Sequence, residues 1–269
     1  MNTCGHSVHE KMLLSVSLKG KNPILLDVPA FGKEFELYFN LFVYDWKLYR
    51  NTVGYCAGDD VLAQSVELQG VWEAFETLLF IDILKRGDGK NLMIDIGANV
   101  GWYSVIAGRM GYKVKAYEGD EEIAEVLRLN GRQNEVEMEL DGEFISTLSK
   151  RVIAPLDSEV EFLKCDIEGS ELSAFRKYED YFKEKKVKYA MFEISPVFND
   201  SYPVLIKSIE ECGYKVFKVP QKGMKYMGEY EVNPLGSVLR YELIQVNDWV
   251  EYLKDVRQED YLFVRSDLV

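Results

Sequence analysis

Apolar and polar residues alternate with two different periods along most of the chain. Short apolar runs with strand-like spacing are followed by stretches in which apolar residues recur every three or four positions, as on one face of a helix. This alternation predicts a mostly parallel sheet with helices on both faces and a ligand site at the carboxyl ends of the strands. The predicted strands cover 91–96, 113–117, 135–140, 161–165, 187–192, 214–219 and 261–265, and the predicted helices cover 72–86, 101–110, 120–129, 171–182 and 202–212. Helix ends are predicted at Gly87, Gly111 and Gly213, and N-caps at Asp120 and Ser170.

Two segments do not follow this alternation. Residues 1–68 contain strand-like runs at 23–28 and 34–39 but no clear chemistry. We therefore predict that they form an N-terminal extension, containing strands, that packs on a main domain formed by residues 69–269. Residues 220–258 interrupt the alternation within the main domain and are expected to form an insertion or lid.

Charge and cysteine content indicate which kinds of protein the chain resembles and which it does not. The chain has 32 Lys and Arg against 45 Asp and Glu, a net charge of −13, which argues against a nucleic-acid-binding protein. Residues 118–171 alone contribute −11 of this charge, and they would repel a polyanionic substrate. The four cysteines are widely spaced without a CxxC pair, and no stretch of 18 residues is uninterruptedly apolar. We therefore expect a cytoplasmic protein with reduced thiols and no membrane segment.

The first predicted strand of the main domain ends in a glycine turn. Asp95 lies at the strand end, Gly97 allows a tight turn, and Gly101 opens a helix. The pattern is D-x-G-x-x-x-G and not the G-x-G-x-x-G that grips a dinucleotide pyrophosphate, so an acid entering the turn favours a ligand with an ammonium group. Glu118 ends the next strand, 21 residues beyond Gly97, where an acid accepts both hydroxyls of a ribose. Together these residues predict a nucleoside cofactor.

A second constellation follows the strand at 161–165, in the order Lys164-Cys-Asp166-Ile-Glu168-Gly-Ser-Glu171. A turn needs at most one acid as a helix cap, so three acids exceed its structural requirement. Strand alternation places Lys164 and Asp166 on the same side of the sheet, where the lysine offsets the mutual repulsion of the carboxylates.

The chain resembles a known family at three segments taken together. Ile94-Asp-Ile-Gly-Ala-Asn-Val-Gly-Trp-Tyr-Ser104, Ala116-Tyr-Glu118 and Phe162-Leu-Lys-Cys-Asp-Ile-Glu-Gly-Ser-Glu171 resemble the FkbM family of S-adenosylmethionine-dependent methyltransferases. The resemblance runs from about residue 73 to 219, and residues 261–265 match its late strand. Two departures are Gly119, where the family usually has proline, and the short, acidic stretch 130–161, which affects the adenine pocket.

The resemblance implies a fold, a reaction and a set of cofactor contacts. The fold is a Rossmann-like, seven-stranded, mostly parallel sheet, the class I methyltransferase fold, formed by residues 69–269. The reaction is the transfer of a methyl group from S-adenosylmethionine to a hydroxyl of a sugar-like or other small acceptor. The residues expected to contact the cofactor are Asp95, Gly97, Ala98, Asn99, Gly101, Trp102, Tyr103, Ser104, Glu118 and Asp166.

Such a reaction needs a base, because the acceptor hydroxyl loses its proton as it attacks the methyl group. The only histidines, His6 and His9, lie near the N-terminus, so a carboxylate or a lysine must take this role. The candidate catalytic residues are Asp166, Glu168, Lys164 and Glu193. Glu171 is more simply explained as an acid at a helix N-terminus.

Several alternatives stay open on the sequence alone. Asp166, Glu168 and Glu193 are also candidate oxygen ligands for a divalent cation, whereas Cys4, His6 and His9 lack a fourth ligand for a soft metal. Other functions for the same sheet are a nucleotide-cofactor oxidoreductase, a non-catalytic cofactor-binding module and an RNA ribose methyltransferase. The acidic balance disfavours the last of these.

Overall fold

The computed structural model describes residues 23–29, 38–44, 62, 65–66, 71–142, 158–219, 242–243 and 246–269. The chain divides into two compact units, residues 1–72 and 73–269, which are described separately. In the first unit, β1 (Pro23–Pro29) and β2 (Tyr38–Tyr44) pair as an antiparallel sheet. The strand predicted at 23–28 is therefore confirmed. The one predicted at 34–39 is found at 38–44, and residues 34–37 lie outside the described residues.

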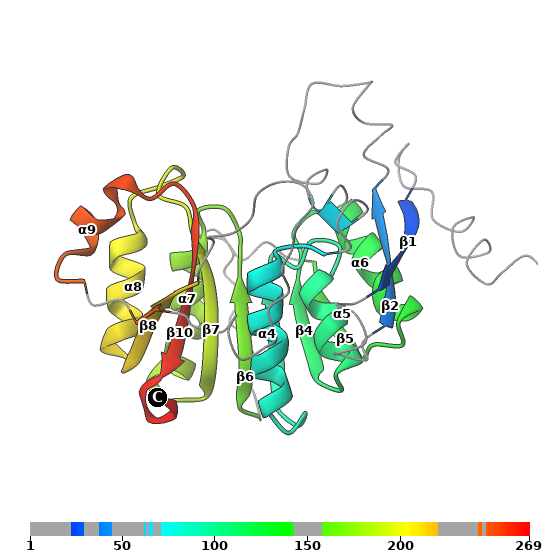
Figure 1. The fold of residues 1–269 in the computed structure, drawn as a ribbon, viewed down its shortest axis with the longest axis horizontal. Coiled ribbons are helices and arrows are strands. Elements are labelled where there is room, and N and C mark those ends of the chain that lie inside the picture. The colour runs from blue at the N-terminus through cyan, green and yellow to red at the C-terminus, as the bar shows by residue number, and fades with distance from the viewer. Residues whose placement is uncertain are drawn as a thin grey trace, which may run out of the picture. The chain divides into compact units, whose positions relative to one another are not determined.

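The second unit is built on one sheet with the strand order β5-β4-β3-β6-β7-β10-β8-β9 (Figure 1). The five strands from β5 to β7 run parallel, and β10 is inserted antiparallel between β7 and β8. The predicted fold class, a mostly parallel Rossmann-like sheet of seven strands, is confirmed, and the eighth strand is a two-residue addition at the edge. The strands are β3 (Leu92–Ile96), β4 (Lys113–Tyr117), β5 (Met138–Asp141), β6 (Val160–Cys165), β7 (Val187–Ile194), β8 (Tyr214–Lys218), β9 (Glu242–Leu243) and β10 (Glu259–Arg265).

The helices begin and end at the signals that the sequence carries, with one exception. Gly87 closes the first helix of this unit through its N–H, and Asp120 caps another by accepting two backbone N–H donors, both as predicted. Ser170 stands at an N-cap position, but its side chain makes no capping hydrogen bond, so its predicted capping role is wrong. The helices are α4 (Ala74–Arg86), α5 (Trp102–Arg109), α6 (Glu121–Gln133), α7 (Glu171–Lys183), α8 (Tyr202–Glu211) and α9 (Trp249–Tyr252), with 3₁₀ turns at Leu253–Asp255 and Ser266–Leu268.

Buried side chains cover both faces of the sheet. On one face, side chains of β3, β6, β7, β8 and β10 form a core with α7 and α8. On the other face, α4 places Phe80 edge-on against Phe162 of β6, with the ring centroids 4.9 Å apart. Strand alternation gives each face its own residues, so Lys164, two positions after Phe162, lies on the α4 face. No helix in the described parts of the chain is long and apolar enough to cross a membrane.

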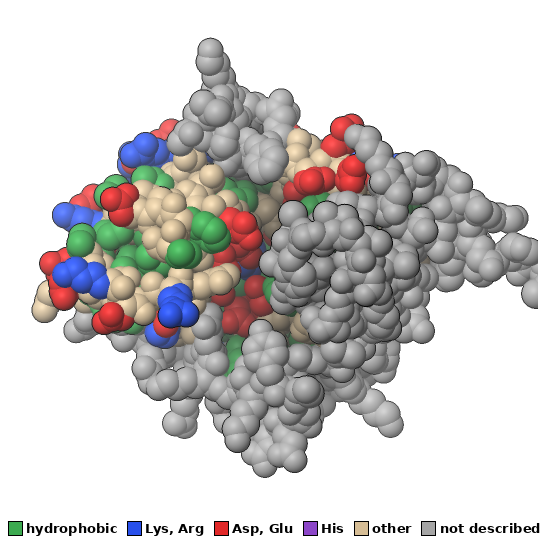
Figure 2. Space-filling model, turned by 90° about the horizontal axis from the view of Figure 1, so that it is seen from above, with side chains coloured by type: hydrophobic (Ala, Val, Ile, Leu, Met, Phe, Trp, Pro, Cys, Tyr) green, Lys and Arg blue, Asp and Glu red, His purple; other side chains and the backbone are tan. Residues whose placement is uncertain are grey.

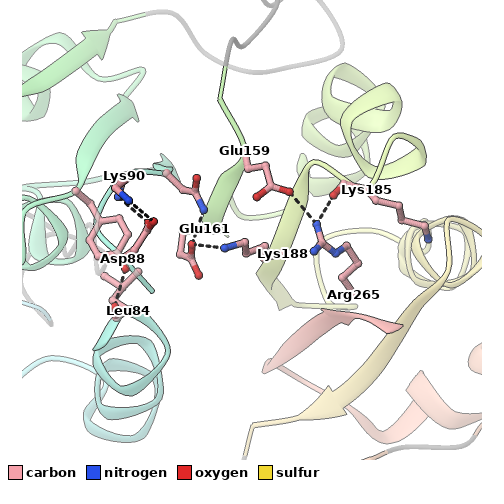
Figure 3. A network of polar contacts seen from close by, with 10 residues as sticks. Leu84, Asp88, Lys90, Glu159, Glu161, Lys185, Lys188 and Arg265 are labelled. Atoms are coloured by element: carbon pink, nitrogen blue, oxygen red, sulfur yellow. Dashed lines mark hydrogen bonds and ion pairs between the residues drawn. The ribbon is translucent and has the colours of Figure 1, made fainter. Parts of the chain in front are cut away.

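A polar network closes the amino ends of the strands (Figure 3). The buried carboxylate of Glu161 accepts hydrogen bonds from the side chains of Asn91 and Lys188, at 2.7 and 2.9 Å. Nearby, Arg265 donates to Glu159 at 3.3 Å. These contacts tie β6, β7 and β10 together at one edge and leave the carboxyl edge as the place for a ligand.

Candidate functional site

The turn after β3 lies directly against the chain that leaves β6. Gly97 and Gly101 have φ angles of +81° and +96°, in the region that favours glycine. The N–H groups of Gly97 and Ala98 both donate to the carbonyl of Tyr117, at 2.9 and 3.0 Å. A Cβ atom on Gly97 would lie 1.9 Å from the carbonyl oxygen of Asp166. The glycine is therefore required for two strand ends to approach each other at the predicted cofactor site.

Glu118 holds this turn to the end of β4. Its Oε2 accepts the N–H of Asn99 at 2.9 Å, and its Oε1 accepts the N–H of Asp120 at 2.9 Å. Asn99 adopts a left-handed conformation (φ +50°), which points its N–H at the carboxylate. A carboxylate has about four lone-pair sites, so these two hydrogen bonds do not by themselves prevent Glu118 from accepting ribose hydroxyls.

Asp95 is turned into the protein at the end of β3. Its side chain is buried, and its Oδ2 accepts the hydroxyl of Ser104 at 2.6 Å. Burial raises the pKa of Asp95 to about 6, although the Ser104 hydrogen bond opposes this shift. In the structure, this pair fixes the first turn of α5 against β3, and its predicted contact with a cofactor stays a prediction.

Trp102 and Tyr103 point towards α4. The indole N–H of Trp102 donates to Thr77 Oγ1 at 2.9 Å, and the hydroxyl of Tyr103 donates to Glu73 Oε2 at 2.6 Å. Both aromatic side chains are buried. Their observed role is to pack α5 on α4, and their predicted contact with the cofactor stays a prediction.

Lys164 is the buried cation of the site. Its Nζ lies 3.1 Å from Asp166 Oδ2 and 3.6 Å from Asp260 Oδ1, and its side chain is 2% exposed. The same Nζ lies 5.4 Å from the ring centroid of Tyr103. The contact with Asp166 confirms that the two residues share one side of β6. The Asp166 carboxylate is thus paired with a buried ammonium ion, although the Asp166 side chain itself is 28% exposed.

Six carboxylates from five elements act electrostatically on this one lysine. Desolvation lowers the pKa of Lys164, but the neighbouring carboxylates outweigh it and raise this pKa well above its usual value. Figure 2, which looks down on the sheet edge that is uppermost in Figure 1, shows acidic side chains gathered at its centre. We call Lys164 and the five of these carboxylates that come from α4, β6, β7 and β10 the Lys164 cluster: Lys164 with Glu73, Glu76, Asp166, Glu193 and Asp260.

Three members of the cluster were not among the predicted site residues. Glu73 and Glu76 come from the start of α4, and Asp260 comes from β10, where it lies opposite Glu193 of β7. The signal for the first two was the presence of two acids, three residues apart, at the start of a mostly apolar stretch. Asp260 has no local signal, because its place depends on the insertion of β10 beside β7.

The other acids after β6 have separate roles. Glu171 is buried and accepts the N–H groups of Ile167 and Gly169 and the hydroxyl of Tyr202, at 2.9 to 3.2 Å. It therefore fastens the turn. Glu168 is exposed in a left-handed conformation (φ +45°) and lies at the rim of the edge. Asp166 and Glu168 have no such fastening role in this turn, and their predicted catalytic roles stay predictions.

The parts of the chain that the structure describes contain no group of three or more His, Cys, Asp or Glu side chains that could hold a metal ion. The alternative in which Asp166, Glu168 and Glu193 bind a divalent cation is not supported by this geometry. Cys4, His6 and His9 lie outside the described residues. We propose no metal site.

The Lys164 cluster predicts a pH dependence of stability. Burial first, and then the charge of Asp166, raise the pKa of Glu193 from 4.5 to about 8. The folded state therefore keeps a proton that the unfolded chain releases, and Glu193 makes stability fall as pH rises from 4.5 to 8. We expect Glu193→Gln to flatten this fall by on the order of 2 kcal/mol between pH 5 and 8, measured by urea unfolding. Exposed Glu211 supplies the control Glu211→Gln, and parallel curves for all three proteins would contradict the assignment.

Comparisons with known proteins give one family model and several solved structures to which the chain is similar. Residues 145–216 match the model described as the methyltransferase FkbM domain, a segment that includes β6 to β8 and Asp166. No curated protein sequence matches the chain. Among solved structures, magnesium protoporphyrin IX methyltransferase from Synechocystis PCC 6803 with bound S-adenosylmethionine is 12% identical with a TM-score of 0.45, covering 82% of this chain and 91% of that one.

Two further solved structures have a similar sequence identity, TM-score and coverage. An S-adenosylmethionine-dependent O-methyltransferase from Thermotoga maritima is 15% identical with a TM-score of 0.45, covering 77% of this chain and 70% of that one. An rRNA methylase from Streptococcus thermophilus is 10% identical with a TM-score of 0.44, covering 71% and 94%. On the family match, residues 145–216 are similar to the methyltransferase FkbM domain, and this similarity supports the activity of an S-adenosylmethionine-dependent methyltransferase.

Proposed function

We propose that this enzyme transfers the methyl group of S-adenosylmethionine to a hydroxyl of a sugar-like or other small acceptor at the carboxyl edge of β3, β4 and β6. The observation that carries the proposal is the position of Asp166. Its backbone lies against the Gly97 turn, and its partly exposed carboxylate is held by buried Lys164. One residue thus links the place for the cofactor to a base for the acceptor.

The groups at this edge suit the cofactor chemically. S-adenosylmethionine supplies an electrophilic methyl group on a sulfonium sulfur. Glu118 provides carboxylate oxygens for the ribose hydroxyls, at the carboxyl end of β4. The negative charge of Asp95 and Asp166, at the ends of β3 and β6, favours the ammonium and sulfonium groups of such a ligand.

Asp166 is assigned the proton transfer. The acceptor oxygen forms its bond to the methyl carbon as the carbon–sulfur bond breaks, and the hydroxyl proton passes to the Asp166 carboxylate. Lys164 remains an ammonium ion and holds the Asp166 carboxylate in place through its hydrogen bond to Oδ2. Glu168, exposed at the rim, orients a hydroxyl of the acceptor. The acidic surroundings favour a neutral or cationic acceptor over a polyanion.

A binding and transfer experiment tests this proposal. We expect S-adenosylhomocysteine to bind in calorimetry and NAD⁺ not to bind. With radiolabelled S-adenosylmethionine, a panel of hydroxylated small molecules is expected to include an acceptor. Binding of NAD⁺ without binding of S-adenosylhomocysteine would overturn the cofactor assignment. Label transfer to amines alone would overturn the assignment of a hydroxyl.

Replacement of Glu118 tests its place in the cofactor site. Glu118→Gln loses the charge that strengthens its two hydrogen bonds to Asn99 and Asp120 and its acceptance of ribose hydroxyls. Hydrogen bonds to a charged group contribute about 1.5–3 kcal/mol, so the affinity for S-adenosylhomocysteine should fall about 10- to 100-fold. Glu121→Gln, an exposed position on α6, should leave the affinity unchanged. Equal affinities in the two variants would contradict the role of Glu118.

A further inference from the structure

We propose that Asp260 is a positioning residue for methyl transfer: from β10 it holds the Lys164 ammonium in the place from which Lys164 holds the Asp166 carboxylate. Its effect on catalysis rests on the proposed function above. Its effect on Lys164 does not, and it can be measured without an acceptor.

Strand register brings the three side chains onto one face of the sheet. Lys164 of β6 lies beside Met191 of β7, and Glu193, two residues further on, lies opposite Asp260 of β10. Because side chains two positions apart share a face, Lys164, Glu193 and Asp260 all point to the α4 side. Lys164 Nζ then lies between Asp166 Oδ2 at 3.1 Å and Asp260 Oδ1 at 3.6 Å.

The buried carboxylate of Asp260 lowers the stability of the fold. Its side chain is 5% exposed, and its Oδ1 has no hydrogen-bond donor among the described residues. A buried polar atom without a donor destabilises the fold. The next positions of β10 on the same face are Leu262 and Val264, both buried and apolar. An apolar side chain would therefore suit the fold at position 260, which indicates that the acid is there for Lys164.

Asp260 and Asp166 are the carboxylates in ion-pair contact with Lys164 within the described residues. With Asp260 removed, the ammonium keeps one ion-pair partner instead of two. It then gains freedom to move away from Asp166, whose carboxylate loses its fixed orientation. The titratable groups that act on Lys164 from the surrounding elements are Asp166 of β6, Glu193 of β7, Asp260 of β10, Glu73 and Glu76 of α4, Tyr103 of α5 and Asp95 of β3.

The first test measures how firmly the ammonium is held. In ¹⁵N-lysine-labelled enzyme, the Lys164 ammonium is assigned by comparison with Lys164→Arg, and the exchange of its protons with water is followed by NMR. We expect exchange at least about tenfold faster in Asp260→Asn. Glu259→Gln is the matched control, because Glu259 directly precedes Asp260 in β10 but pairs with Lys218. Equal exchange rates in wild type and Asp260→Asn would overturn the proposal.

The second test is kinetic. We expect Asp260→Asn to lower kcat about tenfold and to leave KM for S-adenosylmethionine within about twofold. Asp260→Glu, which keeps the charge, should recover most of kcat. If Asp260→Asn does not fold, Asp260→Leu is used in its place. Leucine matches the apolar neighbours on β10 and removes a buried charge. This variant should fold and show the same loss of kcat. Wild-type kcat in folded Asp260→Leu would overturn the proposal even if the exchange rates could not be compared.

Discussion

Asp166→Asn is expected to lower kcat for methyl transfer by about 10²- to 10⁴-fold, because the amide cannot take the proton of the acceptor hydroxyl. The affinity for S-adenosylhomocysteine should fall far less, because only the attraction of the Asp166 charge for the ammonium group of the ligand is lost. The backbone contacts of residue 166 with Ile96 and Gly97 do not depend on its side chain and remain in place. The measurement is single-turnover transfer from labelled S-adenosylmethionine, combined with calorimetry of S-adenosylhomocysteine.

Two variants separate this effect from a general loss of acidity. Glu168→Gln, on the same turn but exposed, should cost less than about tenfold, because Glu168 only orients the acceptor. Asp180→Asn, exposed on α7 and distant in sequence from the turn, should have no effect. If Asp166→Asn retains full activity while Glu193→Gln loses it, the base is Glu193 and our assignment of the proton transfer is wrong.

Much of the fold could be predicted because its elements carry local signals. The periods of 2 and 3.6 residues located the core strands, and Gly87, Gly111 and Asp120 marked helix ends. In the second unit, the differences concern element lengths. Helix α6 continues to Gln133 instead of ending near residue 129, and β5 begins at Met138 instead of Glu135. Both lie at the edge of the sheet, where fewer buried neighbours constrain the pattern.

The candidate site could be predicted only where its residues lie directly after parallel strands. Residues at the ends of parallel strands meet at one edge, so Asn99, Glu118 and Asp166 could be grouped without a structure. Asp260 could not, because β10 runs antiparallel between two strands that precede it by many residues. Predicting residues 102 and 103 at the cofactor rested on the resemblance, whereas helix geometry turns their side chains towards α4.

Gly97→Ala is expected to abolish measurable cofactor binding, with affinity for S-adenosylhomocysteine reduced at least about 100-fold. A Cβ atom at this position would lie 1.9 Å from the Asp166 carbonyl oxygen, which belongs to the backbone and cannot rotate away. The ends of β3 and β6 must then separate, which displaces Asn99 from Glu118 and Asp166 from the turn. We also expect the free energy of unfolding to fall by more than about 3 kcal/mol, measured by urea unfolding.

Gly111→Ala is the control that separates the steric clash of a Cβ atom at position 97 from the strain of an alanine in a left-handed conformation. Gly111 has a similar φ angle, +92° against +81°, but no atom lies within 4 Å of the position that its Cβ would take. Its replacement should cost only the strain of a left-handed alanine, about 1–2 kcal/mol, and leave the affinity for S-adenosylhomocysteine unchanged. The difference between the two variants measures how closely the two strand ends must approach. If both variants lose the same stability and both bind the cofactor normally, contact between these strand ends is not what builds the cofactor site.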